Sequence, residues 1–486
     1  MLATVILVAV FGYFVYRAFA RPSHFPPGPV GLPIVDNLPF LRRPVFKHMS
    51  KLSEKYGDVL GLTFGSYRVV VLNSLSAIYD AYKEDIFTGR PDFSFLLLRT
   101  ENKRGVIFSE GQNWQTIRHF TLRTLRDFGF GKSSIEGLVH FEIEELIKSL
   151  SAVRGAPINL ANRFNLAVVN ALWTMIAGTR FPHDDPEAVQ SIINITKTIQ
   201  TVSAGSPVEF LPLLSKIWPW NEIIKRHLEY LQPLCKLVQM PWESTMTHKT
   251  GDGSDLIHMF IERINNNDDS NPSFDEENGP LNLKNLLIDL YAAGTETTST
   301  SLLWLVLLLA THPEIQEKVQ REIDTHVPRD QLPSIEHRPK LKYKEATIRE
   351  SMRYTSLSPL GVFHTAMVNI EFHGYTIPKR TIFMANMYKI HHSPEHWEKP
   401  DEFYPEHFLD AGGSLKNPEA FIPFSIGKRA YLGESLAKME LFPFSAALFQ
   451  KFTFKFPADR PQPTLEPIVA PILTPKPFEV IAELRD

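Results

Sequence analysis

The stretch Phe424-Ser-Ile-Gly-Lys-Arg-Ala-Tyr-Leu-Gly433 decides how the rest of this chain is interpreted. Its two glycines, Gly427 and Gly433, lie six residues apart. Glycine reaches positive φ at little cost, so this pattern predicts a tight loop of one defined shape. The segment from Glu434 to Glu440 has the composition of a helix start. The sequence therefore predicts a structured, basic loop that leads directly into a helix.

The composition is that of a folded globular protein. Of 486 residues, 43% are hydrophobic and 22% are charged, and no low-complexity run, long charge block or repeat interrupts them. Length alone would suggest about three domains, but no linker divides the chain, so we expect one large domain over residues 31–486. The net charge of −3 gives no indication of nucleic-acid binding. The single cysteine, Cys235, cannot form an intrachain disulfide and is expected to be a small buried hydrophobic residue.

The N-terminus has the pattern of a membrane anchor. Residues Leu2 to Tyr16 are almost wholly apolar and basic residues follow, which makes a short span for a hydrocarbon core about 30 Å thick. Positive charge flanks only the C-terminal side, so the rest of the chain is predicted to face the cytoplasm. A cleaved signal peptide is the alternative, because Ala18-Phe-Ala20 resembles a cleavage site, but no basic segment precedes the apolar run. We expect an anchor at 1–20 and a stiff, proline-rich hinge at 21–30.

Segments of strand character are few. Val59–Phe64 and Tyr67–Leu72 flank Gly-Ser and predict a hairpin with a two-residue turn. A second hairpin is predicted from Phe372–Pro378 and Thr381–Ala385, and a short terminal sheet from residues 471–481. The remainder of the chain is expected to be mostly helical.

One long buried helix is predicted from Leu281 to about Ala310, because the segment is apolar nearly all round. Its middle reads Ala293-Gly-Thr-Glu-Thr-Thr298. Glycine costs roughly 1 kcal/mol against alanine inside a helix, and a carboxylate such as that of Glu296 is costly to bury unless it is paired. Two explanations stay open for Gly294. One is the close approach of a flat ligand, and the other is a helix–helix contact, with Thr297 bonding back to the carbonyl of residue 293.

Two further pairs occur at helical spacing. Trp114 and Arg118 are four residues apart, so they share one face of a predicted helix. Glu350 and Arg353, three apart, do the same on another helix, predicted over residues 341–354. Alone, the first pattern is typical of a packing or cation–π pair and the second of an ordinary ion pair.

Taken together, these motifs resemble the cytochrome P450 family of haem-thiolate monooxygenases. The loop matches the family's haem-binding pattern at Phe424, Gly427, Arg429 and Gly433, and it departs from the pattern at Tyr431, where the family has its cysteine iron ligand. The family's Ala/Gly-Gly-x-Asp/Glu-Thr, Glu-x-x-Arg and Pro-Glu-x-Phe motifs also occur here in the family's order. The resemblance covers essentially the whole chain. It implies a mainly helical α+β fold, one large triangular domain with a β-rich lobe near the N-terminus.

The resemblance also implies a cofactor and roles for single residues. The cofactor is haem b (iron protoporphyrin IX), and Thr297 with Glu296 would deliver protons during oxygen activation. The residues implied in haem binding are Trp114, Arg118, Ala293, Gly294, His364, Phe424, Gly427, Arg429, Tyr431 and Gly433. The implied structural network, which supports the haem loop, is formed by Glu350, Arg353 and His407 of the Pro405–Phe408 segment.

Partners and location follow from the same resemblance. It implies a hydrophobic small-molecule substrate, held by residues 95–108, 200–235 and 359–362. It implies NADPH as the electron source through a reductase, with cytochrome b5 as a further partner. The basic residues after Arg118 would dock an acidic redox partner; they are His119, Arg123, Arg126 and Lys132. The anchor and hinge resemble the microsomal branch, which implies the endoplasmic reticulum membrane with the catalytic domain facing the cytoplasm.

Tyr431 puts the usual chemistry of such a site in question. A thiolate ligand favours O–O cleavage, whereas tyrosine ligates haem iron in catalase, and a phenol, with a pKa of about 10 against about 8.5 for cysteine, needs help to ionise. The phenol oxygen lies roughly 6.5 Å from Cα, compared with about 2.8 Å for a cysteine sulfur, so a loop shaped for cysteine would drive the ring into the porphyrin plane.

Four interpretations of Tyr431 stay open. They are a monooxygenase whose cysteine codon is altered in this sequence, a haem protein with altered ligation, a relative that only binds ligands or partners, and a different class of enzyme. Because the motifs around the ligand position are complete, including Glu296 and Thr297, we favour a monooxygenase in which the change is recent or artificial.

Overall fold

The computed structural model of the protein describes residues 24–32, 35–128, 136–183, 185–187, 189–191, 193, 194, 207–248, 255–266 and 271–485, together with residue 12. The predicted anchor at 1–20 lies outside these residues except for that one position, and so does the first part of the predicted hinge. Within the described ranges, no helix combines the length and the apolar character that a bilayer crossing requires.

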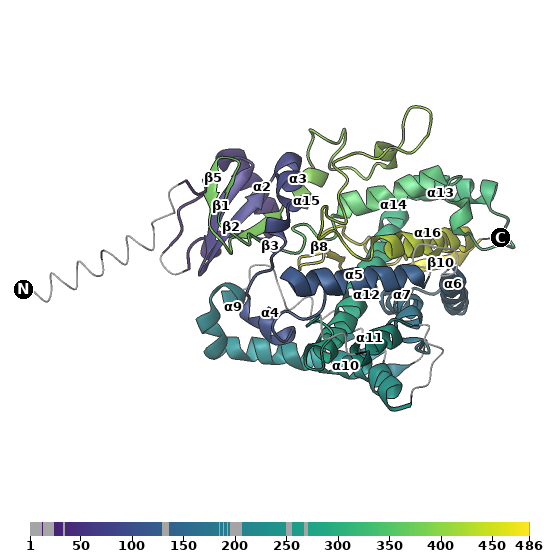
Figure 1. Ribbon diagram of the computed structural model, residues 1–486. Coiled ribbons are helices and arrows are strands. Elements are labelled where there is room, and N and C mark those ends of the chain that lie inside the picture. Colours follow the sequence, from purple (N-terminus) through teal and green to yellow (C-terminus); the bar gives the residue numbers. More distant parts are fainter. Residues whose placement is uncertain are drawn as a thin grey trace, which may run out of the picture.

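Helices make up most of the chain and surround a long central helix, α12 (Asn278–Thr311) (Figure 1). Those before it are α2 (Val45–Tyr56), α3 (Leu75–Tyr82), α4 (Ser94–Arg99), α5 (Gly111–Asp127), α6 (Glu136–Ser151), α7 (Ala161–Ala177), α9 (Pro207–Phe210), α10 (Trp220–His248) and α11 (Leu256–Asn265). Those after it are α13 (Pro313–His326), α14 (Lys342–Thr355), α15 (Met387–His391) and α16 (Glu434–Lys451). The helices predicted over residues 281–310 and 341–354 are confirmed as α12 and α14, with ends shifted by no more than three residues.

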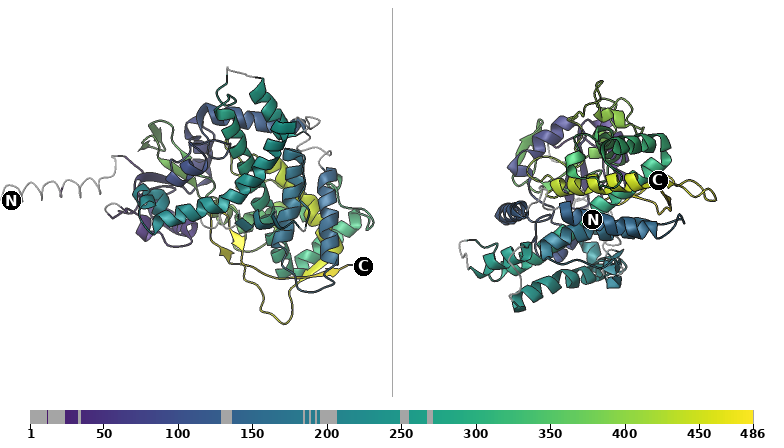
Figure 2. Two further views of the ribbon diagram at one scale, coloured as in Figure 1. Left: turned by 90° about the horizontal axis from the view of Figure 1, so that it is seen from below. Right: turned by 90° about the vertical axis from the view of Figure 1, so that its right-hand side faces the viewer.

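The β-strands of the N-terminal half gather in a lobe beside α2 and α3 (Figure 1). β1 (Val59–Phe64) and β2 (Tyr67–Leu72) are antiparallel with Phe64 opposite Tyr67, so the predicted two-residue turn is confirmed. β6 (Ile382–Ala385) lies parallel to β2, and β3 (His364–Thr365) completes a four-stranded sheet in the order β1-β2-β6-β3. In Figure 2 the purple and light-green segments of this lobe again lie at one side of the molecule, away from the C-terminus.

Two predicted strand pairings are wrong. Instead of forming a hairpin with residues 381–385, β5 (Tyr375–Ile377) pairs with β4 (Ile370–Phe372) just before it. His373 and Gly374 allow that tight turn because both adopt positive φ. The residues assigned to a terminal sheet also pair elsewhere: β9 (Thr474–Pro475) with β8 (Pro467–Ile468), and β10 (Ile481–Leu484) with β7 (Phe452–Lys455). Long-range register, which a local pattern does not encode, decides these pairings.

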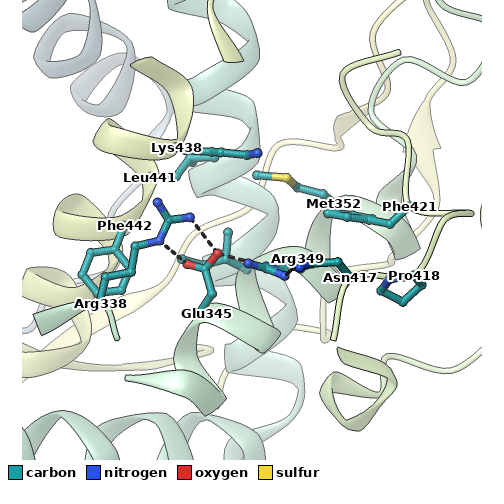
Figure 3. A pocket seen from close by; sticks show the side chains of 11 residues that line it. Arg338, Glu345, Arg349, Met352, Asn417, Pro418, Phe421, Lys438, Leu441 and Phe442 are labelled. Atoms are coloured by element: carbon teal, nitrogen blue, oxygen red, sulfur yellow. Dashed lines mark hydrogen bonds and ion pairs between the residues drawn. The ribbon is translucent and has the colours of Figure 1, made fainter. Parts of the chain in front are cut away.

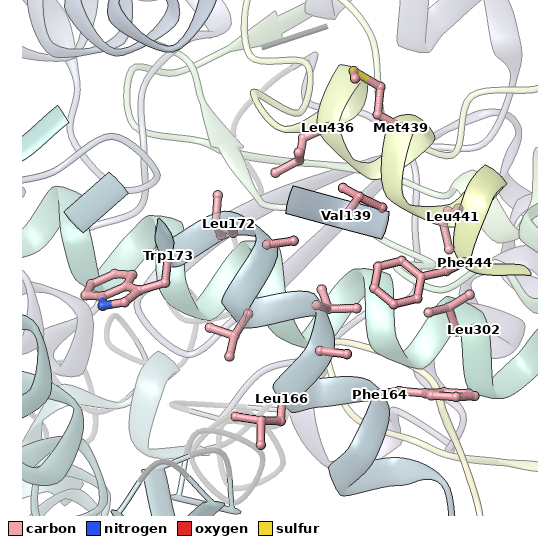
Figure 4. Packing of buried hydrophobic residues seen from close by; sticks show 14 of the residues in the cluster. Val139, Phe164, Leu166, Leu172, Trp173, Leu302, Leu436, Met439, Leu441 and Phe444 are labelled. Carbon is pink, nitrogen blue, oxygen red and sulfur yellow. The ribbon is translucent and has the colours of Figure 1, made fainter. Parts of the chain in front are cut away.

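The main hydrophobic core lies where α7, α12 and α16 pack together, with α6 beside them (Figure 4). Trp173 of α7 is fully buried, and Figure 4 shows Leu172 beside it, with Leu302 of α12 and Phe444 of α16 in the same cluster. α12 buries side chains on nearly all of its faces, which agrees with its apolar sequence. Cys235 of α10 is half-buried and packs against this core. A mainly helical α+β fold is thereby confirmed.

Candidate functional site

The glycine loop, residues 424–433, is held between α3, α5 and α12. Gly427 has a φ of 74°, and an added Cβ there would lie 1.9 Å from the Tyr82 carbonyl oxygen of α3. Only glycine meets both conditions, the positive φ and the close approach. From α5, Arg118 donates to the Ala430 carbonyl at 2.7 Å, and within the loop the Tyr431 amide donates to the Phe424 carbonyl at 2.9 Å. α16 begins at Glu434, directly after the loop, as predicted.

Tyr431 reaches from this loop to α12. Its hydroxyl donates to the Ala293 carbonyl at 3.0 Å and lies 3.3 Å from Oγ1 of Thr297. Thr297 itself donates to the same carbonyl at 2.6 Å. The Tyr431 ring lies nearly parallel to Phe424, with centroids 6.0 Å apart. At Gly433, an added Cβ would come within 2.9 Å of the Tyr431 ring, so this glycine makes room for it.

The Tyr431 phenol is a neutral hydrogen-bond donor. Desolvation by burial, the largest effect, raises its pKa to about 12, although the hydroxyl of Thr297 acts in the opposite direction. Part of the ring nevertheless stays accessible, because Tyr431 is half-buried rather than fully buried. The structure therefore does not provide the help in ionising that a phenolate ligand needs.

A second part of the site is a buried arginine, Arg429, also from the loop. Its guanidinium donates to the carbonyls of Thr88, at 2.6 and 3.0 Å, and Ser109, at 2.6 Å. It also lies over the ring of Trp114, 3.8 Å from the centroid, which is a cation–π contact. The Trp114 side chain is only 4% exposed, and its buried Nε1 has no hydrogen-bond partner among the described residues. A buried N–H without an acceptor is costly, so this atom indicates a missing acceptor.

Arg429 belongs to a cationic cluster with Arg90 and Arg118. None of the three guanidiniums forms an ion pair with a carboxylate in the part of the chain that the structure describes. Burial, followed by the charges of Arg90 and Arg118, lowers the pKa of Arg429 to about 7. Burial likewise lowers the pKa of Arg90, to about 10. Because a guanidinium keeps its proton in proteins, the cluster holds buried positive charge that an anion would stabilise.

His364 lies beside the same cluster. Its ring stacks on Tyr82, with centroids 3.8 Å apart, and its Nδ1 donates to the Phe87 carbonyl at 2.9 Å. Burial, and then the charges of Arg90 and Arg429, hold the pKa of His364 well below its usual range. His364 is therefore neutral at physiological pH and adds no charge to the cluster.

On α12, Gly294 was given two explanations, a helix–helix contact and the approach of a flat ligand, and the structure bears on the first. An added Cβ at Gly294 would lie 2.3 Å from Cδ2 of Leu172 on α7, so α7 packs closely against α12 at this glycine. Thr297 bonds back to the carbonyl of Ala293, as that explanation predicts. Contact of Gly294 with a cofactor stays a prediction. Glu296 is buried.

Asp289 is a functional residue that sequence reasoning missed. Four residues before Ala293, it accepts hydrogen bonds from the amides of Val106 and Ile107, both at 2.9 Å, and pairs with Arg99 at 3.1 Å. It thereby fixes the 99–107 segment, which is part of the predicted substrate region, onto α12. A second acidic residue besides Glu296 in a mostly apolar helix was the available signal. Arg90, in contrast, carried no signal that would separate it from a surface arginine.

Haem b, the implied cofactor, carries two carboxylates at its edge, and the residues present fit that edge. The buried cations Arg90 and Arg429 and the half-buried Arg118 form no ion pair with a described carboxylate, and the Nε1 of Trp114 needs an acceptor. A carboxylate supplies both an opposite charge and an acceptor, and a planar guanidinium is the side chain best suited to bind one.

The centre of the site does not fit haem while Tyr431 lies as it does. The Tyr431 oxygen is about 6.5 Å from its own Cα, and the Ala293 oxygen is 3.0 Å further. The gap between loop and α12 is thus at most about 9.5 Å. A thiolate at this position would use about 2.8 Å plus a metal–sulfur bond of about 2.3 Å, which leaves about 4 Å for the contact of a flat ring with α12. The phenol ring occupies that space instead.

The structural network predicted behind the loop consists of residues that do lie together. Arg353 binds Glu350 through two hydrogen bonds of 2.7 and 2.8 Å, and both side chains are 0% exposed. Nδ1 of His407 lies 3.2 Å from the Glu350 carboxylate, and the Tyr404 amide donates to it at 2.9 Å. Arg353 also donates to the carbonyl of His391 at 2.6 Å. The network thus ties α14 to the segment before the loop.

A cavity of about 210 Å³ lies between α14 and α16, outside this site (Figure 3). Its walls include the apolar side chains of Met352 and Phe421, and Figure 3 shows Arg338 and Arg349 converging on Glu345 there. Arg338 binds that carboxylate at 2.7 and 3.0 Å, and Arg349 binds it at 3.0 Å. Its charged groups are therefore largely paired with one another, and no predicted site residue lines the cavity.

Comparison with known proteins gives a consistent result. The family model described as cytochrome P450 matches residues 26–482. The chain is 36% identical to cytochrome P450 2L1 of Panulirus argus over 100% of both chains. It is 32% identical to farnesoate epoxidase of Bombyx mori, covering 100% of this chain and 99% of that protein. Cytochrome P450 2B19 of Mus musculus is 36% identical over 90% of this chain and 88% of its own length.

Proposed function

The chain belongs to the cytochrome P450 family, whose members are haem b-dependent monooxygenases supplied with electrons from NADPH by a reductase, and from that premise we propose its function. It inserts one oxygen atom of O2 into a hydrophobic small molecule. The observation that carries the proposal is the cluster of buried Arg90 and Arg429 with half-buried Arg118, none of which forms an ion pair with a described carboxylate, beside the Nε1 of Trp114, which has no partner among the described residues. A structural role alone gives no reason to keep such a cluster.

We assign the residues of the site as follows. Arg118, Arg429 and Trp114 bind the carboxylates of the cofactor, and His364 lies beside them. Thr297 and Glu296 carry protons, the role that the family motif gives them; the Thr297 hydroxyl faces the loop at 3.3 Å from the Tyr431 hydroxyl. In the wild-type chain Tyr431 has to leave Ala293 before haem can take its place, so we expect incomplete haem incorporation.

The substrate is proposed to be hydrophobic and to lie against α12 and the 99–107 segment that Asp289 holds. Phe93 and Phe363, whose ring centroids are 6.4 Å apart, add aromatic surface from two further segments. The name of the Bombyx mori relative gives farnesoate as the compound that it epoxidises. A terpenoid acid is therefore a suitable first test compound.

Location and partners are proposed on the exposed surface. Trp218 is 76% exposed and Ile217 53%, which supports contact of this loop with the endoplasmic reticulum membrane. On α5, His119, Arg123 and Arg126 are exposed and provide a basic face for an acidic reductase or cytochrome b5. Lys132, which was predicted to extend this face, lies outside the described residues.

The test compares the wild-type chain with Tyr431→Cys, each reconstituted with reductase, NADPH and a panel of hydrophobic compounds under ¹⁸O2. We expect Tyr431→Cys to bind more haem, to show the strongly red-shifted ferrous–CO Soret band of thiolate ligation, and to incorporate ¹⁸O into product. The wild-type chain should incorporate less haem and less ¹⁸O. If Tyr431→Cys neither binds haem nor labels any product, the proposal is wrong.

A second candidate function is ligand binding without oxygenation. The observation that favours it is the bond from the Tyr431 hydroxyl to Ala293, which places a neutral phenol where the family has a thiolate. This function predicts haem or hydrophobic ligand bound to the purified wild-type chain, with no ¹⁸O in any product and no NADPH consumption linked to substrate. Measurable ¹⁸O incorporation by the wild-type chain would exclude it.

A further inference from the structure

We propose that Tyr431 is an internal closure of the haem slot: bonded to the Ala293 carbonyl, it stabilises the haem-free fold and competes with haem for the space between the glycine loop and α12. The competition rests on the proposed function, since it requires that the chain bind haem. The stabilisation of the haem-free fold does not depend on it.

The contacts of Tyr431 are those of a side chain that fits its place. The hydroxyl has an acceptor at 3.0 Å and a hydroxyl neighbour at 3.3 Å. The ring has a nearly parallel aromatic neighbour, Phe424, and at Gly433 the chain has the one residue type that leaves room for it. A side chain merely displaced by overcrowding would not meet both its polar and its apolar needs.

Tyr431 bridges the slot without filling it. Ala293 and Thr297 on α12 keep partial accessibility, as do Phe424 and Tyr431 across from them, although their neighbours Thr295 and Glu296 are buried. Residues on both walls are therefore incompletely covered beside the ring. The cationic end at Arg429 is separate from the bridge and keeps its hydrogen bonds to the Thr88 and Ser109 carbonyls. Haem would thus compete with Tyr431 at the centre of the slot only.

The bond from Tyr431 to Ala293 and a bound haem exclude each other for a simple geometric reason. The phenol ring and a flat macrocycle need the same layer of the gap of about 9.5 Å between the loop and α12. Seating haem therefore breaks the bond from Tyr431 to Ala293 and turns the ring aside. Whatever free energy the bridge adds to the haem-free fold is subtracted from haem binding.

The experiment uses the full chain with three variants. Tyr431→Phe removes the hydroxyl and keeps the ring, whereas Tyr431→Gly removes both. Tyr67→Phe is the matched control, because its hydroxyl donates to the Asp92 carbonyl at 2.9 Å, the same kind of bond in the N-terminal lobe. For each, the melting temperature of the haem-free protein and the dissociation constant for haem, from titration of the Soret band, are measured.

We expect Tyr431→Phe to melt at a lower temperature without haem and to bind haem about two- to tenfold more tightly, the range of one net hydrogen bond. Tyr431→Gly should shift both quantities further in the same directions. Tyr67→Phe should lower the melting temperature by a similar amount and leave the haem dissociation constant unchanged.

Two results would overturn the inference. One is a Tyr431→Phe variant with the melting temperature and haem affinity of the wild type. The other is weaker haem binding by Tyr431→Phe together with an iron–phenolate band in the resonance Raman spectrum of the wild type, which would make Tyr431 a ligand. Failure of the proposed function looks different: no variant, Tyr431→Cys included, would bind haem, while Tyr431→Phe would still lower the haem-free melting temperature. That outcome would support the claim that Tyr431 stabilises the haem-free fold and would contradict the claim that it competes with haem.

Discussion

Two regions of this protein bury arginine side chains, and they treat the charge in different ways. Behind the loop, Arg353 is 0% exposed and is neutralised by the equally buried carboxylate of Glu350. Its other donors reach the carbonyls of His391 and Pro400 at 2.6 and 2.8 Å. In the loop itself, Arg429 is buried beside Arg90 and the half-buried Arg118, and its hydrogen bonds go to neutral carbonyls such as that of Thr88.

The presence or absence of an ion pair distinguishes a structural network from a candidate binding site. In the Arg353 network each strong donor has an acceptor and the charges balance, so nothing further is needed for the fold. The Arg429 cluster has its hydrogen bonds but no ion pair with a described carboxylate, and the buried Nε1 of Trp114 beside it has no acceptor among the described residues. This difference is the reason for proposing that the Arg429 cluster binds a ligand of opposite charge.

The largest expected effect comes from breaking the balanced network. Glu350→Gln leaves the Arg353 guanidinium buried without its counter-charge and should lower the free energy of unfolding by about 3–5 kcal/mol. Urea denaturation followed by circular dichroism measures it. The double variant Glu350→Gln with Arg353→Met should recover part of that loss, because it removes the orphaned charge. A loss below about 1 kcal/mol in Glu350→Gln would mean that the network is not the structural element described here.

Glu440 provides the converse case, a buried acid without a cation among the described residues. Burial raises its pKa well above the ordinary value of 4.5, and the hydroxyl of Thr298 opposes this only partly. The folded chain therefore keeps a proton that the unfolded chain loses above pH 4.5, so Glu440 destabilises the fold increasingly as pH rises toward the folded pKa.

Glu440→Gln removes that titration while keeping the size of the side chain. Relative to the wild type, the unfolding free energy of the variant should increase from about pH 5 to pH 8, measured by urea denaturation at both values. Glu483→Gln, on the exposed strand β10, is the control that should show no such gain. A difference between Glu440→Gln and the wild type that stays constant with pH would show that Glu440 is ionised in the fold.

A smaller effect on stability is expected in the unbalanced cluster. Arg429→Met loses hydrogen bonds to carbonyls but also removes a buried, unneutralised charge, so we expect a loss of at most about 2 kcal/mol in the haem-free chain. Haem affinity, measured in the Tyr431→Cys background, should fall by about tenfold or more, the range of a charge-assisted hydrogen bond. Equal losses of stability in Arg429→Met and Glu350→Gln would remove the distinction between the two regions.

The sequence could predict those parts of the fold whose cause is local. α12 is apolar nearly all round, and β1 and β2 are two mostly apolar segments joined by a two-residue turn; both were found where the pattern placed them. The family motifs also predicted the position of the glycine loop correctly, since its glycines meet local requirements such as the positive φ of Gly427. The parallel pairing of β6 with β2 joins residues more than 300 positions apart, and no local pattern contains it.

In the candidate site, too, residues marked by a local motif could be predicted and residues that depend on distant segments could not. Arg118, Arg429 and Thr297 were found because a motif with fixed spacing marks them. Asp289 was missed, since its role depends on amides of a segment about 180 residues earlier in the chain. The length of the Tyr431 side chain could be worked out beforehand, and it predicted that a loop shaped for cysteine would drive the ring into the porphyrin plane. Which partner the phenol finds, the Ala293 carbonyl, required the structure.

The smallest effect on stability is expected for an exposed arginine, and it sharpens the contrast with the buried ones. Arg123 on α5 has a side chain 75% exposed and lies 3.9 Å from Asp127, one helical turn away. Arg321 on α13 is 67% exposed and lies 3.9 Å from Glu317, so the two residues differ mainly in their place on the surface. Arg123→Gln and Arg321→Gln should each change the unfolding free energy by less than about 0.5 kcal/mol.

Only Arg123 lies on the face proposed for an acidic redox partner. Arg123→Gln should therefore weaken binding of the reductase several-fold at low ionic strength, and the difference from the wild type should shrink at about 0.5 M salt, where exposed charges are screened. Arg321→Gln should leave reductase binding unchanged at both salt concentrations. If both variants weaken binding equally, net charge rather than the α5 face governs the association, and the exposed arginines of this protein carry no site comparable to that of Arg429.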